Sequence, residues 1–158
     1  MKEFIRIRKI DQSAPTEILD ALVQLHRELD QQEIEVAKLP PVNVLEGYTG
    51  WFDSIEKCLD EVDVYGAFID EQLVGFISYR TYKTYRGIIG GVSYLYVTQE
   101  HRRKGVARKL WDTVEEFFRV KYNVHYVTLD VYVTNTDAIN FYESIGFSPY
   151  IQSMAYKL

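Results

Sequence analysis

The stretch that decides the fold is Tyr94-Leu-Tyr-Val-Thr-Gln-Glu-His-Arg-Arg-Lys-Gly-Val-Ala-Arg-Lys-Leu110. It begins with apolar, β-prone residues, which are typical of a strand. It continues through a polar, basic loop from Gln99 to Lys104. It ends in a helical pattern, because apolar residues recur at three- and four-residue intervals from Val106 to Phe118. The stretch therefore predicts a strand, a basic loop that ends at a glycine, and the start of a helix.

Such an arrangement is suited to hold a phosphate group. The first turn of a helix has backbone N–H groups without intrahelical partners, and the helix dipole favours an anion there. The small residues Gly105 and Ala107 would let a bulky anion approach the backbone. Four basic side chains surround the turn: Arg102, Arg103, Lys104 and Arg108. A basic turn before a helix can equally be ordinary solvated surface, so the loop alone leaves both interpretations open.

Two spacings carry a resemblance to a known family. Arg102-x-x-Gly105-x-Ala107 resembles the Gln/Arg-x-x-Gly-x-Gly/Ala loop of the GNAT superfamily, the acyl-CoA-dependent N-acyltransferases. Farther along, Asn135-x-x-Ala138-x-x-x-Tyr142-x-x-x-Gly-Phe is similar to a second pattern of that superfamily. Together the two cover the C-terminal half, residues 91–150. The N-terminal half resembles the family only in the order of its elements.

The resemblance implies that acetyl-CoA is the cosubstrate, held by backbone amides of the basic loop, with no metal. The residues it implies for cofactor binding are Leu95, Tyr96, Val97, Arg102, Arg103, Lys104, Gly105, Val106, Ala107, Arg108, Asn135, Ala138 and Tyr142. Two of these have structural alternatives. Asn135 is also a good helix cap, and Tyr142 on sequence alone reads as a core aromatic residue.

The implied reaction moves an acetyl group from a thioester to a primary amine by direct attack. The carbonyl oxygen needs a fixed donor, which the resemblance places at a strand N–H near Leu95 to Val97. That N–H is free only where the neighbouring strand, Tyr126 to Val133, splays away. Tyr142 fits the general acid, since a phenol stays protonated at neutral pH. Asp130 is the candidate general base; its alternative is a strand-edge carboxylate without a role.

Two competing functions remain open at this point. A CoA-binding sensor or interaction domain would keep the phosphate cradle and lack turnover. Many relatives place a Glu in the strand before the loop, where this chain has Ser93, Tyr94 and Tyr96, and that difference favours the sensor. A generic nucleotide-binding domain would bind ADP as well as CoA.

The remaining pattern predicts one mixed α/β domain over residues 1–158, with a mostly antiparallel twisted sheet and helices around it. The expected order is β-α-α-β-β-β-α-β-α-β. Gln32 to Asn43 is expected to be a linker, and Gly90-Gly91 a possible bulge. The expected strands are 3–10, 64–69, 73–82, 88–97, 126–133 and 151–158, and the expected helices begin near 15, 45, 106 and 137.

Composition narrows the partners and the location. The chain has 158 residues and a formal net charge of −5, which argues against nucleic acid as the main partner. No apolar run approaches the ~20 residues of a membrane span, and no signal-peptide pattern opens the chain, so we expect a cytoplasmic protein. The acceptor is expected to be a small-molecule or peptide amine. The final predicted strand could pair across a homodimer.

Two single residues are expected to be structural. Cys58 is the only cysteine, which excludes an internal disulfide, and its position in a helix favours buried packing. His26 has no second histidine or cysteine at metal-ligand spacing, so it is expected at the surface or rim rather than as a ligand.

Overall fold

The computed structural model describes residues 4–38 and 55–156. Its elements follow the chain as β1 (Arg6–Ile10), α1 (Thr16–Ala37), α2 (Ile55–Glu61), β2 (Asp63–Ile69), β3 (Gln72–Thr84), β4 (Gly87–Val97), η2 (Gln99–His101), α3 (Val106–Val120), β5 (Val127–Thr128) and α4 (Thr136–Ser144). The predicted mixed α/β class is confirmed.

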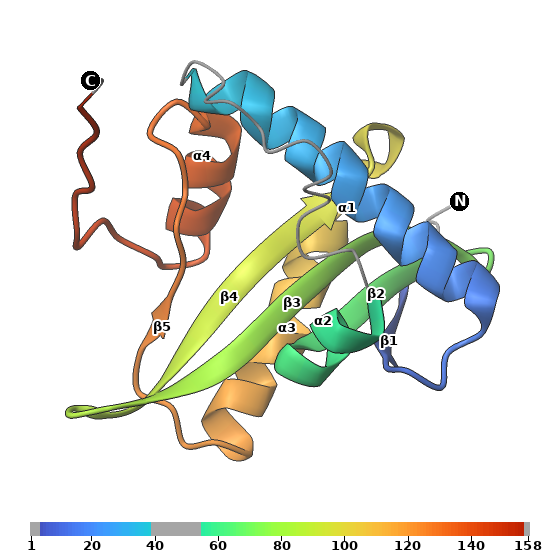
Figure 1. The fold of residues 1–158 in the computed structure, drawn as a ribbon, viewed down its shortest axis with the longest axis horizontal. Helices are drawn as coiled ribbons and strands as arrows, with labels where there is room; N and C mark the ends of the chain where they lie inside the picture. The colour runs from blue at the N-terminus through green and yellow to red at the C-terminus, as the bar shows by residue number, and fades with distance from the viewer. Residues whose placement is uncertain (1–3, 39–54, 157–158) are drawn as a thin grey trace.

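The strands of the described residues form one sheet in the order β1-β2-β3-β4-β5 (Figure 1). The first three pairings are antiparallel, and β5 lies parallel to β4. Asp70 and Glu71, between β2 and β3, have φ of 47° and 64°. Positive φ at two successive turn residues matches the twist of the flanking strands, which explains the tight hairpin predicted there. The β4–β5 pairing requires a crossover, and α3 supplies it.

Helices cover both faces of the sheet. Helices α1 and α2 lie over one face and α3 lies over the other (Figure 1). Because strand side chains alternate, each strand contributes to both cores. The core under α3 includes Val74, Ile77, Leu110, Val114 and Phe118. The core under α1 and α2 includes Leu25, Cys58, Phe68, Phe76 and Tyr96.

The longest pairing, between β3 and β4, contains one irregularity. Ser78 pairs with Tyr94 and Tyr79 pairs with Val92, so Ser93 is the extra residue of a β-bulge. The bulge therefore lies at Ser93 and not at Gly90-Gly91. Those two glycines serve close packing instead, because an added Cβ would lie 2.7 Å from the ring of Phe118 at Gly90 and 2.5 Å from the ring of Tyr82 at Gly91.

Three predicted elements differ from the structure. The strand expected over 126–133 is reduced to Val127–Thr128. The strand expected over 151–158 is wrong, since residues 151–156 have no regular structure. The linker expected from residue 32 begins late, because α1 continues to Ala37. The first ten residues of the second helix, predicted from Leu45, and residues 39–43 of the predicted linker lie outside the described residues.

Of the two residues expected to be structural, Cys58 lies where it was predicted and His26 does not. Cys58 is buried in the core under α1 and α2, as predicted. His26 is also buried, with only 4% of its surface exposed, so the surface position predicted for it is wrong. Its ring lies against Phe76 and Tyr94, with centroids 5.8 and 4.6 Å away. Burial lowers the pKa of His26 to about 4, which keeps the imidazole neutral at pH 7.

Candidate functional site

The site begins where β4 and β5 part. The two strands pair only through Gly90 with Val127 and Gly91 with Thr128. Beyond that point the chain leaves β5 while β4 continues to Val97, which bears out the splay predicted from the sequence. A groove lies in this opening, between α1, β4, the segment after β5, and α4. The residues that line it are Leu29, Gln32, Glu33, Val92, Ser93, Tyr94, Leu95, Leu129, Asp130, Val131, Tyr132, Asn135, Ala138 and Tyr142.

The backbone of β4 presents alternate peptide groups to this groove. Thr98 N–H donates to the Val74 carbonyl at 2.9 Å, which places the polar groups of Thr98 on the β3 side. In an antiparallel ladder the next residue turns its N–H and C=O to the opposite side. The Val97 carbonyl is consistent with this alternation, since it accepts a hydrogen bond from Arg102 Nε at 2.9 Å and not from β3. By the same alternation Leu95 faces the groove.

Tyr96 therefore lies differently from its two neighbours. Its backbone pairs toward Phe76 of β3, and its side chain is buried on the α1 face. The Tyr96 hydroxyl donates to Glu28 Oε2 at 3.0 Å. The structure thus directs the backbone polar groups of Leu95 and Val97 away from β3 and those of Tyr96 toward it.

The loop after β4 leaves the start of α3 open. Arg103 and Gly105 both have left-handed backbones, with φ of 62° and 82°. Gly105 is the N-cap of α3, no side chain caps this end, and no acidic residue occupies the first turn. An added Cβ at Gly105 would meet nothing within 4 Å. The first-turn N–H groups are thus open to an external anion, which fits a diphosphate.

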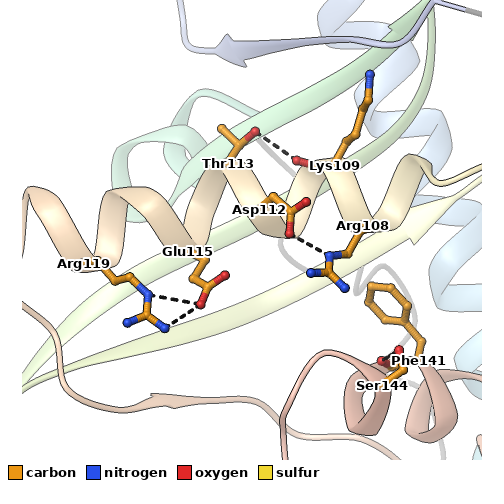
Figure 2. A network of polar contacts seen from close by, with 8 residues as sticks. All are labelled: Arg108, Lys109, Asp112, Thr113, Glu115, Arg119, Phe141 and Ser144. Carbon is orange, nitrogen blue, oxygen red and sulfur yellow. Dashed lines mark hydrogen bonds and ion pairs between the residues drawn. The ribbon is translucent and has the colours of Figure 1, made fainter.

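Two of the basic side chains predicted to bind the cofactor have partners within the protein. Besides Val97, Arg102 donates to Gln32 Oε1 at 2.7 Å, so this side chain joins the loop to β4 and α1. Arg108 Nε pairs with Asp112 Oδ1 at 2.8 Å along α3 (Figure 2). Both side chains of that pair are more than half exposed, and such pairs are worth at most about 1 kcal/mol. Arg108 can thus turn to a phosphate at little cost, whereas Arg102 holds the loop in place.

The other loop residues divide by exposure. Arg103 and Lys104 are exposed. Val106 is buried in the core under α3, so only its backbone can meet a ligand. Ala107 is half-buried and packs against the same core.

The α4 wall of the groove is built around a capped helix start. Asn135 Oδ1 accepts from Ala138 N–H at 3.3 Å, as its capping role predicts. Ala138 and Tyr142 are one turn apart on the face that lines the groove. The Tyr142 ring packs edge-on against Phe147, at 5.7 Å between centroids, and Phe147 packs in the same way on Trp111 of α3 at 5.0 Å. These ring contacts fix α4 against α3 and aim Tyr142 into the groove.

The ionisation of Tyr142 follows from this position. Burial, with a smaller contribution from the charge of Glu33, raises the pKa of Tyr142 to about 12. The phenol therefore stays protonated throughout the physiological range and can donate a hydrogen bond. Asp130, exposed on the segment after β5, lines the same groove.

Sequence reasoning missed the wall that α1 contributes. Leu29, Gln32 and Glu33 line the groove, and their spacing puts them on one helix face. Nothing local distinguishes them from other residues of an amphipathic helix. The fold alone brings them opposite α4, where Thr134 Oγ1 donates to the Val36 carbonyl.

Two absences complete the description. In residues 4–38 and 55–156, no group of three or more His, Cys, Asp or Glu side chains is placed to hold a metal ion. None of the helices described there is both long and apolar enough to cross a membrane.

Solved structures share this fold over nearly the whole chain. A ribosomal-protein-alanine N-acetyltransferase from Brucella melitensis biovar Abortus 2308 superposes with a TM-score of 0.71, at 19% identity over 98% of this chain and 100% of that one. An aminoglycoside acetyltransferase from an uncultured soil metagenomic sample gives 0.71, at 18% identity over 98% and 97%. An aminoglycoside N-acetyltransferase solved with CoA gives 0.72, at 16% identity over 99% and 95%.

Sequence comparison places the chain in a family. No curated protein matches it. The model of the acetyltransferase (GNAT) family matches residues 17–147, which include both patterns and the residues that line the groove. The chain therefore belongs to the acetyltransferase (GNAT) family, the acyltransferases that take their acyl group from acetyl-CoA.

Proposed function

We propose that this protein is an N-acetyltransferase that moves the acetyl group of acetyl-CoA to a primary amine by direct attack. The amine nitrogen forms a bond to the acetyl carbon, the carbon–sulfur bond breaks, and the amine proton leaves to a base. The observation that carries the proposal is the early parting of β4 and β5, which leaves Leu95 and Tyr142 lining one groove.

Each part of the reaction has a candidate group in the protein. The open start of α3 is suited to the diphosphate of CoA, with Arg103, Lys104 and Arg108 around it. The N–H of Leu95 or Val97 is suited to donate to the thioester carbonyl oxygen, where negative charge develops. Asn135 and Ala138 line the same groove as Leu95.

Tyr142 is proposed to act on the leaving sulfur. Its pKa of about 12 lies well above the ~8.5 of a free thiol. Complete proton transfer from the phenol to the thiolate is therefore uphill. The hydroxyl serves better as a hydrogen-bond donor that stabilises the thiolate as it forms, with solvent supplying the proton afterwards.

Asp130 is proposed to assist loss of the amine proton. A lysine-like amine has a pKa of ~10.4 in water and attacks only when neutral. Asp130 is exposed at the groove, so a water molecule between it and the amine is a natural route for the proton. The acceptor is a small-molecule or peptide amine that enters from this open side.

The test is release of CoA in the presence of amines. Protein with acetyl-CoA should release free thiol when spermidine, an alanine tripeptide amide or kanamycin is added, and should release none without an amine. The same protein should bind CoA more tightly than ADP by calorimetry. Tight CoA binding without thiol release from any amine would contradict the proposed reaction and favour a sensor.

We propose also that a second copy covers the C-terminal segment, residues 150–156. Its large apolar side chains are 70–89% exposed: Tyr150, Ile151, Met154 and Tyr156. The segment is β-prone, and the outer edge of β5 has no strand beside it among the described residues. The chain should therefore be dimeric by light scattering and become monomeric when cut after Pro149; a monomeric full-length chain would contradict this.

A further inference from the structure

The groove carries acidic side chains, and the role proposed for Tyr142 does not involve them. Two carboxylates line it, Glu33 from α1 and Asp130 from the segment after β5. Its other ionisable lining residues are the tyrosines Tyr94, Tyr132 and Tyr142. No lysine, arginine or histidine is among the described residues that line it. The charged side chains that line the groove in the described part of the chain are thus all acidic.

Of the two carboxylates, Glu33 is the one built into the wall. It is half-buried in the penultimate turn of α1, whereas Asp130 is exposed. The guanidinium of Arg102 reaches the adjacent Gln32 and donates to it and to the Val97 carbonyl. Glu33 lies near enough to Tyr142 that its charge helps to raise the pKa of that phenol. Glu33 therefore stands beside the reacting end of the groove.

The surroundings of Glu33 favour a cationic ligand. Burial, together with the negative charge of Asp30, raises the pKa of Glu33. Both effects disfavour the ionised carboxylate, and an ammonium group placed beside it would reverse them. A half-buried carboxylate without a compensating cation is costly, and a ligand that supplies the cation recovers that cost.

We propose that the Glu33 carboxylate binds the ammonium group of the acceptor and so selects cationic amines for the groove. This rests on the proposed function, since it places the acceptor beside the thioester. Glu33 acts in binding: it holds the charged form of the amine next to Tyr142, and the proton leaves afterwards toward Asp130 and solvent. A neutral acceptor would form no ion pair with Glu33, and an anionic acceptor would be repelled by it.

The test measures acceptor binding directly, apart from turnover. Calorimetry with spermidine, titrated into the protein saturated with CoA, gives the dissociation constant of the amine. Glu33→Gln keeps the size of the side chain and removes its charge, so spermidine binding should weaken by about 10- to 100-fold. Binding of CoA itself should stay within about twofold, since the phosphate loop is untouched.

Matched variants separate this role from general effects. Glu35→Gln removes an equal charge from the exposed face of the same helix and should leave spermidine binding unchanged. Glu33→Asp retains the charge and should recover part of the affinity. Unchanged spermidine affinity in Glu33→Gln, or an equal loss in Glu35→Gln, would overturn the proposal.

Turnover then separates amine binding by Glu33 from the acetyl transfer itself. In the steady state Glu33→Gln should raise KM for the amine at least tenfold and leave kcat within about threefold, as loss of uniform binding requires. A fall in kcat with unchanged KM would overturn the binding role. Glu33-dependent amine binding in a wild-type protein that releases no CoA would support this inference and defeat the proposed function.

Discussion

The starts of α3 and α4 are built in opposite ways. Asn135 caps α4 from within, through its own side-chain oxygen on Ala138 N–H. Gly105 begins α3 without a side-chain cap, without an acidic residue in the first turn, and with open space beside it. A side chain of the protein binds an N–H group at the start of α4, whereas the N–H groups at the start of α3 are open to a ligand.

This contrast separates residues that hold the groove from residues that bind. A cap stabilises the folded protein at all times, whereas an open helix start contributes only when an anion is present. Substitutions at the α4 start should therefore change stability and barely change CoA affinity. Substitutions at the α3 start should do the reverse.

The largest effect is expected from Gly105→Glu. The new side chain would place bulk and negative charge where the diphosphate is proposed to bind, and it would strain a backbone with φ of 82°. Loss of two or more charge-assisted hydrogen bonds corresponds to at least about 100-fold weaker CoA binding. Calorimetry with CoA measures it, and unchanged affinity would remove the loop from the site.

Gly87→Glu is the matched control for that substitution. Gly87 also has a left-handed backbone, with φ of 113°, and an added Cβ there meets nothing within 4 Å. It lies in the β3–β4 turn, at the opposite end of β4 from the loop (Figure 1). It should destabilise the protein by a similar amount and leave CoA affinity unchanged.

A smaller effect, confined to turnover, is expected from Tyr142→Phe. The ring contacts with Phe147 survive, so CoA affinity should stay within about twofold, while kcat should fall roughly 10- to 100-fold through loss of the donor to sulfur. Because the pKa of Tyr142 is about 12, the wild-type rate should show no alkaline decline from this group up to pH 10. Tyr132→Phe, on the same groove, should leave kcat unchanged. Equal kcat in wild type and Tyr142→Phe would exclude the role at sulfur.

The smallest effect is expected from Asn135→Ala. Removal of a helix cap costs typically about 1 kcal/mol of folding free energy, which urea denaturation can measure. CoA affinity should change by less than about threefold. The exposed Asn140→Ala, in the middle of α4, is the control and should cost less. A large loss of CoA affinity in Asn135→Ala with normal stability would break the division between holding and binding.

Local signals predicted the parts of the fold that depend on local chemistry. The β2–β3 turn needs left-handed residues, α4 needs Asn135 at its start, and Gly146 follows its end with φ of 108°. The two motifs that resemble the family, in the loop after β4 and at the start of α4, were likewise found from residues close together in the sequence. These features lie within a few residues of the groups they satisfy, so the sequence displays them.

Features that depend on distant contacts were not predictable in the same way. Residues 126–133 have strong β propensity, yet only two pair, because the chain turns away from β4 to form the groove. Residues 151–156 have similar propensity and pair with no strand of residues 4–38 or 55–156. Glu33 faces Asp130 across nearly one hundred residues of sequence, and only the packing of α1 over the sheet brings them together.

The extra residue at Ser93 has a consequence for how this protein can change. It shifts the alternation of β4 by one position, so that Val92 points to α3 and Tyr94 to α1. Deleting one residue here would exchange the two faces for everything up to Val97, and would turn the Leu95 amide from the groove toward β3. The number of residues in β4, and not only their composition, therefore sets which of its backbone groups face the groove.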